Sequence, residues 1–196
     1  MTRPTKSKIL YAVVLLVLIG LGVTVIKLFH FRPNTLVILA LFYLIPGRVT
    51  SFFWREFYRG QELVKQRQYL QAKICFENFL RKIRSNPWIK KLIYFKWGIY
   101  TWEIEAMTLN NIGSISLELN DLEGAVQSFD AAIARDPQFP LPFANLAIVN
   151  YVRGNSDQGV QLLNHSHLLG CSLLDEQSAQ KEAMTIRARL NAKEQN

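Results

Sequence analysis

Two apolar runs dominate the first quarter of the chain. Residues 9–26 contain no charged side chain. As a helix with a rise of 1.5 Å per residue, this run would extend roughly 27 Å, which is close to the hydrocarbon thickness of a bilayer. A second run, over residues 35–54, is uncharged apart from Arg48. The pattern predicts a membrane anchor in residues 1–54, with transmembrane helices at about 9–29 and 35–54.

Each predicted span has an alternative interpretation. A cleaved signal peptide also places basic residues before an apolar core, but residues 9–26 are longer than a usual signal core and no A-x-A-like cleavage site follows them. A retained anchor is therefore favoured. In the second run, Arg48 would lie inside the span unless it reaches the interface near the helix end. The alternative is a shorter re-entrant or interfacial segment, which would place the C-terminal part of the chain outside.

Positive charge is concentrated in the half of the chain that adjoins the apolar runs. The formal net charge of +8 divides into +12 for residues 1–105 and −4 for residues 106–196. A cation near anionic headgroups contributes about 1 kcal/mol, so the asymmetry indicates attraction to a membrane, and no nucleic-acid motif accompanies it. Lys and Arg lie before the first run and after the second, and the positive-inside rule then places both ends in the cytoplasm. We expect a multi-pass protein of the cell's inner membrane with a cytoplasmic C-terminal part.

A helical pattern with a polar break follows in the second half of the chain. Apolar residues recur every three or four positions in residues 108–118, and the polar stretch LND comes next, at 119–121. A second periodic stretch, LEGAVQSFDAAIARDP, covers residues 122–137. The pattern predicts a helix, a three-residue turn and a second helix that ends at Pro137.

This unit resembles a tetratricopeptide repeat, a helical hairpin of 34 residues. The residues that carry the resemblance fall at the family's spacings: Gly113, Ala125, Phe129, Ala132 and Pro137. A downstream unit has Phe143, Leu146, Ala147, Gly159 and Leu163, and an upstream unit has Gly60, Leu63, Tyr69, Ala72, Phe76 and Phe79. Because one hairpin cannot bury its own apolar face, about three stacked units are expected to share a core over residues 55–170.

The upstream unit is out of phase with the others. Ala72 and Ala125 are 53 residues apart, which is 19 more than one repeat. The excess predicts an insertion at residues 86–104. This segment is rich in aromatic and basic residues: Trp88, Lys90, Lys91, Lys96, Trp97 and Trp102. As an α-helix it would have a broad apolar face, which lies either in the lipid headgroup layer or, as a lengthened first helix of the next unit, against protein.

Residues 171–196 predict a capping helix with a frayed tail. A start at Ser172 or Asp175 gives this helix an apolar inner face, made of Ala179, Ala183, Ile186 and Leu190. The whole sequence therefore predicts an all-α protein. An N-terminal transmembrane helical hairpin would precede a short α-solenoid of about three tetratricopeptide-like helix pairs and the capping helix.

The residue types offer no constellation for catalysis. Phosphate-binding, nucleophile-elbow and zinc-protease motifs are absent from the sequence. His165 and His167 lie two apart on a predicted helix and point about 200° apart, so they cannot chelate one metal ion together. Cys75 and Cys171 have no metal-ligand spacing and are expected to be reduced core residues. We expect no enzymatic activity, no cofactor and no metal site.

The resemblance implies a binding groove. In tetratricopeptide proteins the first helices of successive units line a concave surface that holds a peptide or a partner helix, often through Asn side chains. By repeat spacing this groove would be lined by Met107, Asn110, Asn111, Ser114, Glu118, Leu141, Asn145, Ile148 and Tyr151, with Phe57 and Gln61 from the first unit. Asn111 and Asn145 occupy equivalent places and would either bind the ligand or bridge neighbouring helices. Phe57 and Asn110 replace the Lys of relatives that clamp a C-terminal carboxylate, so an apolar or internal segment is expected.

These patterns predict a membrane-anchored adaptor or scaffold that binds a protein or peptide partner in its groove. Such a protein would act in the assembly of a membrane or envelope complex. The alternative is a structural or lipid-binding subunit of a membrane complex, which would bind anionic headgroups through residues 86–104. A fold does not by itself choose between them.

Overall fold

The computed structural model describes residues 48–95 and 100–194, together with scattered positions between residues 9 and 24. The described residues form helices and no strand, which confirms the predicted all-α class. None of the helices within these residues is both long and apolar enough to cross a membrane. The two predicted spans, at about 9–29 and 35–54, lie mostly outside the described residues.

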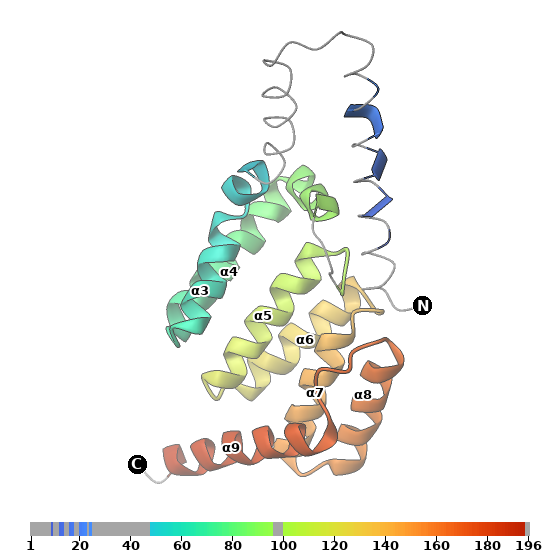
Figure 1. Cartoon of the computed structure of the whole chain (residues 1–196). Helices are drawn as coiled ribbons and strands as arrows, with labels where there is room; N and C mark the ends of the chain where they lie inside the picture. The colour runs from blue at the N-terminus through green and yellow to red at the C-terminus, as the bar shows by residue number, and fades with distance from the viewer. Residues whose placement is uncertain are drawn as a thin grey trace.

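The described helices form three antiparallel pairs that stand side by side, and a last helix crosses the ends of helices in the second and third pairs (Figure 1). The pairs are α3 (Arg55–Lys65) with α4 (Tyr69–Ser85), α5 (Ile104–Glu118) with α6 (Leu122–Arg135), and α7 (Pro140–Arg153) with α8 (Ser156–Leu168). A 3₁₀ helix, η1 (Pro87–Phe95), connects the first pair to the second, and α9 (Glu176–Glu194) ends the described chain. The arrangement buries the apolar faces between neighbouring pairs.

The three pairs turn in the same way. Each turn places one residue in the left-handed region, namely Arg67 with φ 58°, Asn120 with φ 61° and Gly154 with φ 86°. These residues are 53 and 34 positions apart, which are the spacings that the sequence gives for Ala72, Ala125 and Gly159. The pairs therefore repeat in backbone geometry as well as in residue type.

Within each pair, a glycine lies directly against an aromatic ring. A Cβ atom on Gly60 would lie 2.9 Å from the ring of Phe76, and one on Gly113 would lie 2.5 Å from the ring of Phe129. Both distances are shorter than a van der Waals contact. In the third pair the two positions are exchanged, with the glycine on the second helix and the aromatic residue on the first. A Cβ atom on Gly159 would lie 2.8 Å from the ring of Tyr151. The two helices of every pair therefore approach as closely as the missing side chain allows.

The inserted segment differs from its prediction. It was expected to be an α-helix with one broad apolar face, but residues 87–95 form a 3₁₀ helix, and Ile104 already belongs to α5. Side chains three positions apart share one side of a 3₁₀ helix, and Ile89 and Leu92 have this spacing. Both are buried in the core that the first two pairs share, as is Ile93. Protein therefore covers the inner side of this segment.

A buried carboxylate fastens the inserted segment to the two pairs beside it. The side chain of Glu105 on α5 is 1% exposed. It accepts a hydrogen bond from Arg84 of α4 at 2.8 Å and from Lys90 of η1 at 2.6 Å, and Arg135 of α6 lies 3.2 Å away. Burial raises the pKa of Glu105, but the hydrogen bonds from Lys90 and Arg84 and the charges of Lys90 and Arg135 outweigh it and lower the pKa below the ordinary value. One ionised carboxylate thus connects four elements.

The last helix is more than a cap on the final pair. It packs on α7 with the predicted inner face, of which Ala179, Ala183 and Ile186 are buried. Arg187 donates to the carbonyl oxygens of Tyr151 and Val152 at the end of α7, at 2.8 and 2.7 Å. Arg189 donates to the Glu118 carboxylate at the end of α5, at 2.7 Å. Since the C-terminal end of a helix carries partial negative charge, both cations stabilise the crossing of α9 over α5 and α7.

We predict that Gly113→Ala destabilises the fold. Alanine favours a helix over glycine by roughly 0.5–1 kcal/mol, but its Cβ would overlap the Phe129 ring, and overpacking of this kind costs about 1–3 kcal/mol. A net loss of about 1–2 kcal/mol is expected in thermal unfolding of the full chain in mild detergent. Phe129→Leu removes the ring, so the double variant should lose less than the sum of the two single losses. Strictly additive losses would contradict the close contact.

We predict that Glu105 makes the fold sensitive to acid. Its pKa in the folded chain is below the ordinary 4.5, so its stabilising contribution is complete above that value and disappears as the pH falls through the lowered pKa. Glu105→Gln should cost about 1–3 kcal/mol near neutral pH, less than in a fully buried pair, because Arg84 and Arg135 are about half exposed. The difference in melting temperature between the two chains should shrink between about pH 5 and pH 3. A constant difference in melting temperature over that range would contradict the stabilising role of the ionised Glu105.

Candidate functional site

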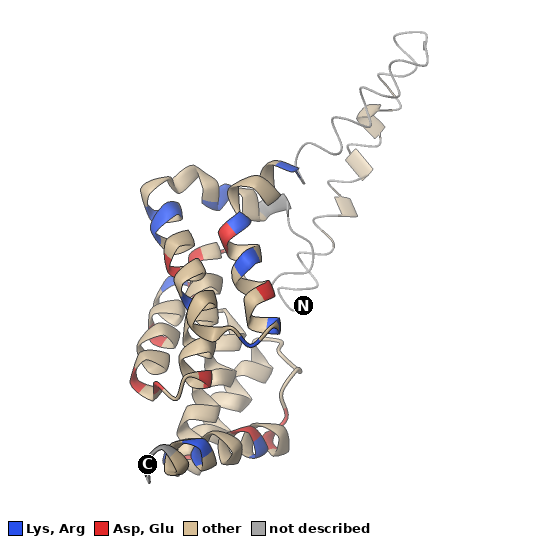
Figure 2. Ribbon diagram, turned by 90° about the vertical axis from the view of Figure 1, so that its left-hand side faces the viewer, with Lys and Arg blue, Asp and Glu red and all other residues tan. Residues whose placement is uncertain are grey.

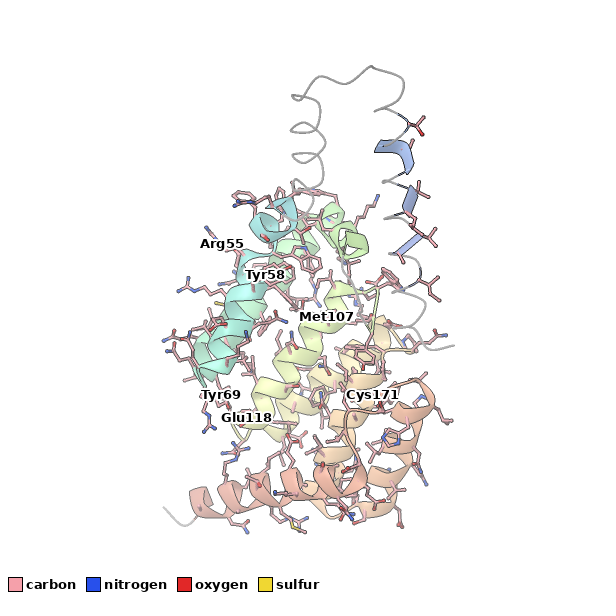
Figure 3. The ribbon with its side chains drawn as sticks, viewed as in Figure 1. Arg55, Tyr58, Tyr69, Met107, Glu118 and Cys171 are labelled. Carbon is pink, nitrogen blue, oxygen red and sulfur yellow. The ribbon has the colours of Figure 1, made fainter. Side chains whose placement is uncertain are left out.

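The first helices of the three pairs, together with α4 and α9, share a hollow with a volume of about 320 Å³. It is lined by Gln61, Val64, Tyr69, Phe76, Asn111, Ser114, Ile115, Leu117, Glu118, Asn145 and Glu182. Tyr69 and Glu118 lie at the same end of the molecule, on neighbouring pairs, and Arg55 lies at the opposite end (Figure 3). We call this hollow the groove. Its lining mixes amide, hydroxyl and carboxylate groups with apolar side chains.

Four of the nine residues predicted to line the groove do so: Asn111, Ser114, Glu118 and Asn145. Three others are corrected by the structure, because Asn110, Ile148 and Tyr151 are 5%, 2% and 6% exposed and belong to the interior. Repeat spacing assigns these three side chains to the exposed face of α5 and α7, but they lie on the face that packs against neighbouring helices. Met107 and Leu141 are half-buried against the core of the first two pairs and do not line the groove.

The two equivalent asparagines have different roles. Asn145 on α7 donates from its side-chain nitrogen to Asn110 Oδ1 at 3.0 Å and to Ser114 Oγ at 3.2 Å, both on α5. It therefore bridges the second and third pairs. Asn111 on α5 makes no side-chain hydrogen bond within the described residues and faces the groove half-exposed. Of the two interpretations that the sequence leaves open, bridging describes Asn145, and Asn111 keeps its amide available.

One end of the groove carries an excess of negative charge. Glu118 is neutralised by Arg189, but Glu182 on α9, which also lines the groove, forms no ion pair among the described residues. Partial burial raises the pKa of the Glu182 carboxyl, and the charge of Glu118 raises it further, against a smaller lowering by Arg189. No Lys or Arg is among the lining residues. The groove therefore matches a ligand that brings one cation.

Several lining residues were missed by sequence reasoning. Tyr69 and Phe76 belong to α4, a second helix, which the spacing rule assigns to packing alone. Glu182 belongs to α9, which was predicted only as a cap. The signal that would have found Glu182 is its place beside the inner face of the helix, three positions after Ala179 and four before Ile186. The direction in which α9 crosses the other helices follows from the contacts of Arg187 and Arg189, which no periodicity shows.

A second, more open hollow of about 670 Å³ lies between α6, α7 and α8. Its lining is Val126, Asp130, Phe143, Leu146, Asn150, Arg153, Gln158, Gln161, Leu162 and His165. The Phe143 and His165 rings pack edge to face within it, with centroids 4.5 Å apart. Charges of both signs occur here, and Arg153 is paired with Glu123. Asp130 then has no ion pair among the described residues, so this hollow also carries one unpaired carboxylate and differs from the groove chiefly in being more open and in lying away from the first pair.

The residues predicted to face a membrane surface are divided by the structure. Trp88 is 48% exposed and Lys91 is exposed, whereas Lys90 is bound to Glu105. Trp102 is half-buried. Lys96 and Trp97 lie outside the described residues. Of the six residues, therefore, only Trp88 and Lys91 are exposed in the described part of the chain.

The chemistry of the groove is suited to binding. Its amides, hydroxyls and carboxylates are groups that can hydrogen-bond an extended backbone or a cation, and its apolar side chains can pack against an apolar side chain. Within the described residues, no group of His, Cys, Asp and Glu is arranged to hold a metal ion, and both cysteines are free thiols. No protein-family model matches this chain, and no curated protein matches it either.

We predict that the two asparagines separate in stability measurements. Asn145→Ala leaves the buried Asn110 amide without its donor, which should cost about 1–3 kcal/mol. Asn111→Ala breaks no hydrogen bond within the described residues and replaces a poor helix former with a good one, so stability should stay equal or rise slightly. Thermal unfolding of both full-length variants in the same detergent measures the difference. Equal losses in the two variants would contradict the assignment.

Proposed function

We propose that this chain is a membrane-anchored helical-repeat adaptor of the tetratricopeptide type, and that its groove holds a segment of a partner protein. The observation that carries the proposal is the groove itself, in which Asn111 and Glu182 have neither a hydrogen bond nor an ion pair among the described residues. A half-buried polar group ordinarily finds a partner, so the unpaired amide of Asn111 is suited to a ligand, and the exposed carboxylate of Glu182 lies in the same groove.

The repeat geometry supports the family assignment. Two pairs place a glycine of the first helix against an aromatic residue sixteen positions later, Gly60 with Phe76 and Gly113 with Phe129. Hairpin repeats of this kind stack their first helices along one face, and extended ligands commonly bind that face. The anchor proposed for residues 1–54, with spans at about 9–29 and 35–54, rests on the uncharged runs of the sequence. It would hold the repeats at the cytoplasmic face of the inner membrane.

The chemistry of the groove narrows the kind of partner. Val64 and Tyr69, both half-buried, provide an apolar surface, and Glu182 supplies the excess negative charge. The proposed ligand is therefore an internal protein segment that has an apolar residue and a Lys or Arg close together. Anchoring at a membrane raises the local concentration of the groove for membrane partners by about a hundredfold or more, so single contacts need not be strong.

The test is site-specific photo-crosslinking of the full-length chain in intact membranes. A photoreactive residue replaces Asn111 in the groove or, as the matched control, Asn164, which is exposed on α8. We expect a protein to be crosslinked from position 111 and not from position 164. The crosslinked peptide, read by mass spectrometry, should contain Lys or Arg beside apolar residues. Identical products from both positions, or none from position 111, would refute the groove as the functional site.

We predict opposite effects of Glu182→Gln on stability and on binding. Because its folded pKa is raised, the ionised Glu182 opposes folding above that pKa, so the neutral variant should melt at an equal or higher temperature near neutral pH. Capture of the crosslinked partner should fall by roughly fivefold or more, since one charge-assisted contact is lost. Glu77→Gln, at an exposed residue of α4 outside the groove, is the matched control and should change neither. Unchanged capture by Glu182→Gln would remove the cation from the proposal.

A further inference from the structure

Aromatic side chains from two segments, residues 52–53 and Trp88, gather at one end of the molecule. Phe52 is 70% exposed and Trp88 is 48% exposed. Phe53 lies between them, with its ring centroid 5.2 Å from that of Phe52 and 4.6 Å from that of Trp88, and both contacts are edge to face. Segments 35 residues apart in sequence thus form one exposed apolar surface.

Cations surround these rings. Arg48 lies one helical turn before Phe52, and Lys91 lies three residues after Trp88, which is one turn of the 3₁₀ helix. Arg48 and Lys91 are exposed and form no ion pair within the described residues. The side chain of Arg55 is 79% exposed, and its one ion pair within the part of the chain that the structure describes is with Glu56, at 3.9 Å. We call Arg48, Phe52, Phe53, Arg55, Trp88 and Lys91 the aromatic–basic end; Figure 2 shows Lys and Arg on both segments that form it.

The aromatic–basic end is mounted on a fixed base. Trp54 is 2% exposed and donates its indole N–H to the carbonyl oxygen of Ile89 at 3.4 Å. Ile89 and Ile93 are buried on the inner side of η1, and Lys90 is bound to Glu105. The neighbouring residues Lys90 and Lys91 therefore differ, one serving the fold and the other facing solvent. Buried contacts thus hold together the two backbone segments that carry the exposed rings and cations.

We infer that the aromatic–basic end binds the headgroup layer of an anionic membrane. Trp at the interface and Lys or Arg beside it are the residue types that this layer favours, and each cation multiplies the bound population about fivefold. The expected partner is a membrane rather than a free anion, because the uncharged stretch of residues 35–47 immediately precedes Arg48. This inference does not require a ligand in the groove, and binding here would fix how the groove is presented to membrane partners.

The test compares amide hydrogen exchange of the full chain in nanodiscs of neutral lipid and in nanodiscs that contain phosphatidylglycerol. The anchor is the same in both, so a simple tether predicts no difference. We expect exchange in residues 87–95 to slow by about fivefold or more in the anionic nanodiscs, with no change in α9. High salt should reverse the effect. Identical exchange of residues 87–95 in the two lipids would overturn the inference.

Matched variants separate the surface from general charge. Lys91→Glu should abolish the lipid-dependent protection, while Lys181→Glu, the same change on an exposed residue of α9, should leave it. Phe52→Ser should weaken it, and Leu168→Ser, at a residue 84% exposed on α8, should not. Equal effects within either pair would overturn the inference, as would protection that appears only when a second protein is added. Crosslinking from Asn111 reports the groove independently, so failure of one proposal leaves the other measurable.

Discussion

The close approach of two helices at a glycine is the contact on which the rest of this fold depends. Gly113 lies so near the Phe129 ring that no side chain fits between them, and Gly60 and Phe76 repeat the arrangement. Helices that meet this closely form flat pairs with one apolar face on each side, and such a face is stable only when the next pair covers it. The stacking, and with it the shared line of first helices, therefore follows from a contact inside each pair.

The groove is then completed by an element outside the repeats. Helix α9 packs on α7 and crosses the ends of α5 and α7, where Arg187 and Arg189 bind the terminal carbonyls and the Glu118 carboxylate. This crossing carries Glu182 to the groove. The same helix thus neutralises one carboxylate of the groove and adds another, so the net charge available to a ligand is a property of α9 as much as of the repeats.

The sequence predicted the elements well where periodicity and special residues agreed. The turn at LND, the facing positions of Gly113 and Phe129, and the inner face of the last helix are local patterns that depend only on helical geometry. The roles of the other residues depend on contacts between segments that are far apart in sequence. Asn111 and Asn145 are indistinguishable by spacing, but only Asn145 meets a buried amide across the pair boundary. The contact that fastens residues 87–95 is likewise non-local, because Glu105, which binds Lys90, lies fifteen residues further on.

Two charged residues from the two halves of the sequence lie at opposite ends of the molecule. Arg55, within the basic half, lies at one end of the first pair, and Glu118, within the acidic half, lies at the opposite end of its helix beside α9 (Figure 3). Were the acidic end of the groove next to anionic headgroups, like charges would repel and the cation of a ligand would be drawn to the lipid. With the aromatic–basic end against the membrane, the negative end of the groove points away from it. A basic segment would then meet Glu182 without competing with the surface proposed to bind the membrane.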